Sequence, residues 1–216
     1  MNMRWISIVA VCVLLAFGHP TWPQSKSKTI PKDPPDTHPQ YFPEGVFRDS
    51  SESGWFQGSK ERWYAKHLRS MREPSLSEAS KDNSLVTYRF LWLRTFHSPI
   101  AIRIIIHVDG TGTLTGKMTN GKGGYNAGNL TLNESHELTK AQVEEFLGLL
   151  QRASFWSAPS EDGTGGDDGA HWVLEGVENG RYHIVDRWSP KKSDFERVCL
   201  FLFEHSRIRV EAQEIY

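Results

Sequence analysis

Residues 170–188 contain the feature that constrains the fold most, a predicted β-hairpin. Two runs rich in aromatic and β-branched residues flank the pair Asn179-Gly180. Asn-Gly favours a two-residue type I′ turn, because both turn positions need a positive φ. Such a turn also sets the register, so it pairs Trp172 with Arg187 and Val173 with Asp186. The fold must therefore include an antiparallel sheet that accepts this hairpin.

The rest of the chain alternates between helix and strand patterns. Apolar side chains at helical spacing predict three helices, at 59–72, at 139–153 and from Pro190 onward. His67 lies on the apolar face of the first, where we expect a packed histidine rather than a ligand-binding one. Further strands are predicted at 84–95, 100–108 and 112–119, and glycine-rich loops at 120–130 and 163–169. Grouped strands with interspersed helices indicate an α+β fold, with a single antiparallel or mixed sheet of about five strands and helices packed mainly on one face.

The N-terminal segment predicts export. Arg4 precedes an uncharged apolar run from Trp5 to Phe17, and small residues near Gly18 favour cleavage there, which is the pattern of a signal peptide. The run is too short to span a bilayer comfortably, although an uncleaved anchor is the alternative. We predict a signal peptide at 1–18, a proline-rich linker at 19–43, a single α+β domain at 44–206 and a C-terminal tail at 207–216. The protein would then be periplasmic or secreted.

The composition excludes several classes of function. Lys and Arg number 25 against 26 Asp and Glu, so the chain is not a broadly basic nucleic-acid binder. Two Cys exclude a disulfide framework and a Cys-based zinc cluster. Cys199 falls mid-helix on the apolar side, a poor place for a nucleophile. Neither a Gly-x-Ser-x-Gly nor a His-Glu-x-x-His motif occurs, and we expect no metal site and no cofactor.

The hairpin carries most of the candidate site residues. Its alternation places His171, Glu175, Asp186 and Trp188 on one face, and Trp172, His183 and Arg187 on the other. One interpretation is a partly exposed hairpin in which Arg187 stacks on Trp172. The other is a shallow aromatic-lined cleft with His171, Glu175 and Asp186 as its polar groups. Asp186 lies diagonally from His171 at about 7–8 Å, too far for a hydrogen bond unless the side chains reach.

Several longer motifs extend beyond the hairpin. They are Glu73-Pro74-Ser75-Leu76, Tyr88-Arg89-Phe90-Leu91-Trp92-Leu93-Arg94 with Phe96-His97, Gly123-Gly124-Tyr125 with Gly128, Phe155-Trp156, Asp168-Gly169-Ala170-x-Trp172, Glu175-Gly176 and Tyr182-His183-x-Val185-x-Arg187-Trp188-Ser189-Pro190. Across residues 60–203 the chain thereby resembles a family of uncharacterised exported bacterial proteins. The resemblance implies a shared pattern that includes Arg89, His97, Tyr125, Trp172, Glu175, His183 and Arg187. It implies no activity, and Ala127 stands where we expect the pattern to have a proline.

These features favour a non-catalytic binding or interaction module of the cell envelope. We expect an unknown envelope partner or a small polar ligand, no nucleic acid, and membrane contact only through an uncleaved signal segment. The candidate ligand-binding residues are Arg89, His97, Tyr125, His171, Trp172, Glu175, His183, Asp186, Arg187 and Trp188. The alternative is a hydrolase that uses His171 or His183 with Glu175 or Asp186. That alternative predicts that Arg89, His97, Glu175, His183 and Arg187 converge in one pocket.

Overall fold

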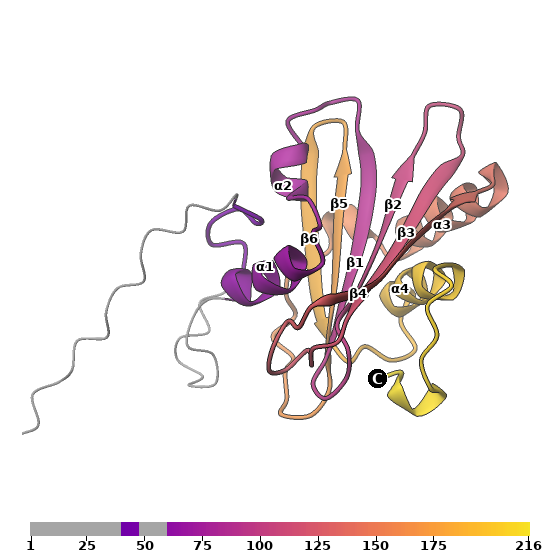
Figure 1. The fold of residues 1–216 in the computed structure, drawn as a ribbon. Coiled ribbons are helices and arrows are strands. Elements are labelled where there is room, and N and C mark those ends of the chain that lie inside the picture. The colour runs from indigo at the N-terminus through magenta and orange to yellow at the C-terminus, as the bar shows by residue number, and fades with distance from the viewer. Residues whose placement is uncertain (1–39, 48–59) are drawn as a thin grey trace, which may run out of the picture. The chain divides into compact units, whose positions relative to one another are not determined.

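A computed structural model describes residues 40–47 and 60–216, and Figure 1 shows a single antiparallel sheet in the order β4-β3-β2-β1-β5-β6. The strands are β1 Val86–Arg94, β2 Ile100–Ile106, β3 Gly112–Thr119, β4 Leu130–Leu138, β5 Ala170–Glu178 and β6 Arg181–Trp188. The helices are α1 Lys60–Ser70, α2 Leu76–Ala79, α3 Lys140–Arg152 and α4 Asp194–His205, with short 3-10 turns at Phe155–Ser157 and Ala212–Glu214. The predicted α+β class is therefore confirmed.

The sheet has six strands, where the sequence predicts about five. The additional strand is β4, an edge strand whose residues are mostly exposed or half-buried. Its sequence, Leu-Thr-Leu-Asn-Glu-Ser-His-Glu-Leu, carries few apolar side chains. Polar edge strands of this kind resist pairing with other chains, and for the same reason they give a weak strand pattern.

The hairpin forms in the predicted register. Trp172 pairs with Arg187 and Val173 with Asp186 across β5 and β6. Asn179 and Gly180 have φ values of 52° and 73°, as the type I′ turn requires. This agreement means that the two predicted faces of the hairpin are also the observed ones.

Two apolar clusters cover the two faces of the sheet. On one face, Tyr88, Phe90 and Trp92 of β1 pack in the cluster that includes α3 and α4. On the other face, Leu91 and Leu93 pack with residues of α1 and with the segment 41–47. The two longest helices thus share one face, while α1 lies against the other (Figure 1). Burial on both sides explains why apolar side chains of β1 point to both faces of the sheet.

Both ends of the predicted domain extend further than the sequence suggests. Tyr41 and Phe42, at the end of the predicted linker, are buried at 6% and 2% exposure. The predicted C-terminal tail packs against the domain, since Ile208 is buried and the Trp172 indole donates a hydrogen bond of 2.9 Å to the backbone oxygen of Tyr216. The predicted signal peptide and residues 19–39 of the linker lie outside the described residues. No helix within 40–47 or 60–216 is long and apolar enough to cross a membrane.

Candidate functional site

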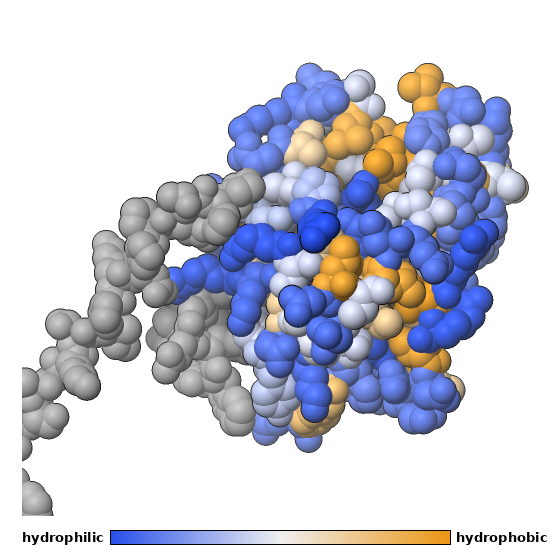
Figure 2. Space-filling view, viewed as in Figure 1, coloured by the Kyte–Doolittle hydropathy of each residue, from blue (hydrophilic) through white to orange (hydrophobic). Residues whose placement is uncertain are grey.

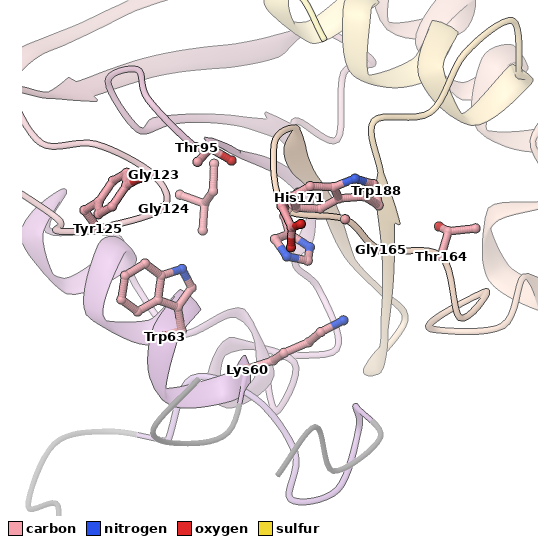
Figure 3. Close-up of a pocket in the computed structure, with 13 residues that line it drawn as sticks. Lys60, Trp63, Thr95, Gly123, Gly124, Tyr125, Thr164, Gly165, His171 and Trp188 are labelled. Atoms are coloured by element: carbon pink, nitrogen blue, oxygen red, sulfur yellow. The ribbon is translucent and has the colours of Figure 1, made fainter. Parts of the chain in front are cut away.

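A cavity of about 350 Å³ lies where β1 and β6 end and β5 begins. Five parts of the chain form its walls (Figure 3). They are the start of α1 (Lys60, Trp63), the end of β1 (Leu93, Thr95), two glycine-rich loops (Gly123-Gly124-Tyr125 and 164–167) and the hairpin (His171, Trp188). The site therefore depends on segments that are distant in the sequence.

Glycines allow both loops to approach the sheet closely. The backbone N–H groups of Gly123 and Gly124 each donate a hydrogen bond of 3.0 Å, to the carbonyls of His97 and Thr95. A Cβ on Gly123 would lie 2.5 Å from the carbonyl oxygen of Arg94, which only glycine avoids. In the second loop, a Cβ on Gly169 would lie 2.6 Å from the Trp188 ring. The glycines therefore hold these loops against the strand ends and the indole.

His171 and Asp186 form a hydrogen-bonded pair beside this cavity. The distance from His171 Nδ1 to Asp186 Oδ1 is 3.1 Å. From the sequence, this diagonal pair could bond only if the side chains reached toward each other, and in the structure they do. The Trp188 ring packs edge-on against the imidazole, with 4.7 Å between ring centroids. This contact and the Asp186 bond together set the orientation of the imidazole.

Asp186 is held in its ionised form by its surroundings. Its Oδ2 accepts hydrogen bonds from the Tyr64 hydroxyl at 2.8 Å and from Lys60 Nζ at 3.0 Å, and Lys60 also forms an ion pair with Glu161. Burial by itself would raise the pKa of the carboxyl group, but His171, Lys60 and Tyr64 stabilise the carboxylate and lower its pKa to about 2. Asp186 can therefore hold the His171 ring throughout the physiological pH range.

Arg89 and Glu175 lie in a separate, closed network of charges. Arg89 Nη2 and Nε donate to Glu175 Oε2 at 2.6 and 2.8 Å, and both side chains have no exposed surface. Glu73 accepts from Arg103 at 2.9 Å and pairs with Lys117 at 2.8 Å. Burial raises the pKa of Glu73, but the surrounding cations outweigh it and the pKa lies below its ordinary value. This network is closed to solvent, and Glu175 does not line the cavity.

The remaining predicted residues are dispersed. Trp172 is buried in the core shared with α3 and α4, and His183 contacts the Ala158 carbonyl oxygen at 3.0 Å on that same face. Arg187 donates to the Pro159 carbonyl oxygen at 2.9 Å and lies over the Phe195 ring, not Trp172. His97 Nδ1 bonds the Tyr216 hydroxyl at 2.8 Å.

The convergence that the hydrolase hypothesis predicts is therefore absent. The five residues Arg89, His97, Glu175, His183 and Arg187 do not share a pocket in the described structure. Three predicted residues do line one cavity, namely Tyr125, His171 and Trp188. A fourth, Asp186, lies against it through His171 and Lys60.

The contribution of α1 to the site has no signal in the sequence. Lys60 belongs to the basic face and Tyr64 to the apolar face of an ordinary amphipathic helix. No local sequence pattern indicates that either residue contacts Asp186. More than 120 residues separate each from that carboxylate. Only the packing of α1 on the sheet brings them together.

Comparison with known proteins finds no relative that would explain the site. No protein-family model matches the chain, and no curated protein matches it. Within residues 40–47 and 60–216, no group of three or more His, Cys, Asp or Glu side chains could hold a metal ion.

Proposed function

We propose that this protein is an exported binding module that takes a small ligand into the cavity between α1, the two glycine loops and the hairpin. The observation that carries the proposal is the cavity itself, where aromatic side chains surround an oriented histidine. Small-molecule sites typically have volumes of about 300–1,000 Å³, apolar walls and a few placed polar groups. Export rests on the N-terminal sequence pattern and places the ligand in the cell envelope.

The surface also favours a small ligand over a large apolar partner. In Figure 2 the visible face carries several hydrophobic patches separated by hydrophilic residues. The exposed large hydrophobic residues among those described are Phe96, Val108, Tyr125, Leu147 and Ile215, and of these only the Phe96 and Tyr125 rings are recorded in contact, with 6.1 Å between centroids. An extended docking face for protein or lipid would gather such residues into one patch.

A hydrolase is the second candidate, and the His171–Asp186 pair is the observation that favours it. An imidazole held at Nδ1 by a carboxylate can accept a proton from water at its other nitrogen. Water would have to be the nucleophile, since the Thr95 and Thr164 hydroxyls of the cavity donate to Gly169 and Asp162. Cys199 is buried in α4 and does not reach the cavity.

Thermal unfolding with a ligand panel tests the binding proposal. The panel contains neutral sugars, nucleotides and peptidoglycan fragments, and a ligand at 100 times its Kd stabilises the protein by about 2.7 kcal/mol. For a domain of this size we expect a Tm rise of several degrees. Tyr125→Ala should abolish the shift, whereas Val108→Ala, at an exposed position outside the cavity, should preserve it. An equal shift in Tyr125→Ala would contradict the assignment of the cavity.

Export is tested separately by cell fractionation. The full chain, produced in a bacterial host, should appear outside the cytoplasm with residues 1–18 removed, as mass spectrometry would detect. An intact chain retained in the cytoplasm would refute export without bearing on the cavity.

A further inference from the structure

The charges around the cavity disfavour an anionic ligand. Lys60 is the sole Lys or Arg among the described lining residues, and its Nζ already bonds Asp186 and pairs with Glu161. Asp167 also lines the cavity. With or without a proton on His171, these described groups sum to a negative charge. A phosphate or carboxylate would therefore meet a net negative charge from these groups, and no described lining residue offers it an uncommitted ammonium or guanidinium group.

His171 restricts which hydrogen-bonding groups on a ligand can bind it. Its Nδ1 faces Asp186, so Nε2 is the nitrogen left for a ligand, and it bonds no described residue. In the neutral ring Nε2 accepts a hydrogen bond, and in the protonated ring it donates one. An ammonium group matches only the first state and a carbonyl only the second. A hydroxyl group donates and accepts, so it matches both.

The aromatic walls add a second requirement. Figure 3 shows Trp63 and Tyr125 on one side of the cavity, with His171 and Trp188 on the other. The faces of aromatic rings carry partial negative charge and attract the slightly positive C–H groups of a saturated ring. A purely apolar ring would fill the space but leave the buried histidine nitrogen without a partner. The walls and His171 together select a ring that has both C–H faces and hydroxyl groups.

We infer that the ligand is an uncharged carbohydrate unit that bonds His171 Nε2 through a hydroxyl group and lays its C–H face on the aromatic wall of the cavity. This inference rests on the proposed binding function and narrows it to one class of ligand. It also explains the glycine loops, because side chains at Gly123 and Gly124 would displace the wall that carries Tyr125.

Titration calorimetry with matched sugars tests the inference. The probes are N-acetylglucosamine and its short oligomers, glucose and maltose as neutral sugars, glucosamine as a cationic one and glucose 6-phosphate as an anionic one. We expect a neutral sugar to bind at least tenfold more tightly than its charged counterparts. His171→Ala should weaken that binding about 2- to 10-fold, as the loss of one hydrogen bond predicts. Val108→Ala should bind as the unchanged protein does.

Two results would overturn the inference, and they differ in what they leave standing. If glucose 6-phosphate, glucosamine or a nucleotide binds better, and Tyr125→Ala abolishes that binding, the carbohydrate assignment fails but the binding site stands. If none of the neutral sugars binds, the carbohydrate assignment fails. If the nucleotides and peptidoglycan fragments do not bind either, the proposed binding function is refuted as well. Because Tyr125 is 58% exposed, its variant should fold even where His171→Ala does not, which keeps the test decisive.

Discussion

Acidification should destabilise this protein through His67, and replacement of that side chain should remove the effect. His67 lies on the inner face of α1 with no exposed surface. Neither ring nitrogen has a hydrogen-bond partner of good geometry among the described residues, the Gly123 backbone offers only a weak interaction that opposes the pKa shift, and the Trp63 ring packs edge-on at 5.0 Å. Burial, with a smaller contribution from the Lys66 charge, lowers the pKa of His67 to about 4.

The size of the effect follows from proton linkage. Between pH 6.5 and 4 the unfolded chain protonates this histidine while the folded chain keeps it neutral, so stability falls as pH falls. A shift from 6.5 to about 4 costs about 2 kcal/mol of unfolding free energy at pH 5 and about 3 kcal/mol at pH 4. In a domain of ordinary stability this is a large fraction of the total.

Urea denaturation followed by tryptophan fluorescence measures the difference. The free energy of unfolding is compared at pH 7.5 and pH 5 for the unchanged protein, for His67→Phe and for His107→Gln, which alters an exposed histidine. We expect His67→Phe to lose about 2 kcal/mol less than the other two proteins between these pH values. Any packing cost of the larger ring cancels, since it is present at both pH values. Equal losses in all three proteins would refute the reasoning.

Three further predictions follow from the buried charges and the glycine wall. Arg89→Met should lower the free energy of unfolding by about 3–5 kcal/mol, because it leaves Glu175 buried without its cation; a loss below about 1 kcal/mol in chemical denaturation would contradict this. Because the pKa of Asp186 is lowered from 3.8 to about 2, this carboxylate should contribute a loss of about 2 kcal/mol in the free energy of unfolding between pH 4 and pH 2. Chemical denaturation of Asp186→Asn at the two pH values should show a loss smaller by that amount. Gly123→Ala should cost about 1–3 kcal/mol by thermal unfolding and weaken ligand binding, since its Cβ would press on the Arg94 backbone; unchanged values of both would show that the loop can move freely.

Much of the fold could be predicted from local patterns. The Asn179-Gly180 turn set the hairpin register correctly because the turn geometry itself determines which residues pair. The predicted helix at 139–153 also forms, and Thr139 and Gln142 make a capping box at the start of α3, which is a local sequence pattern. Strand β4 was not predicted because an exposed edge strand needs few apolar residues and therefore gives a weak alternating pattern. The docking of residues 208–216 was not predicted because their partners are distant in the sequence: Arg94 lies 120 residues from Glu214, and Trp172 lies 44 residues from Tyr216.

The candidate site, like the fold, could be predicted only in part from the sequence. The sequence by itself determined the chemistry available on the hairpin, namely that His171, Asp186 and Trp188 share one face, because side chains alternate along a strand of known register. It also determined that His67 would be packed, because helical spacing places it on the apolar face of α1. Only the tertiary structure decided that Asp186 meets His171 and that Glu175 is closed off beside Arg89. The reason is physical: side-chain reach and the position of α1 on the sheet depend on packing between distant segments, and no local pattern in the chain encodes that packing.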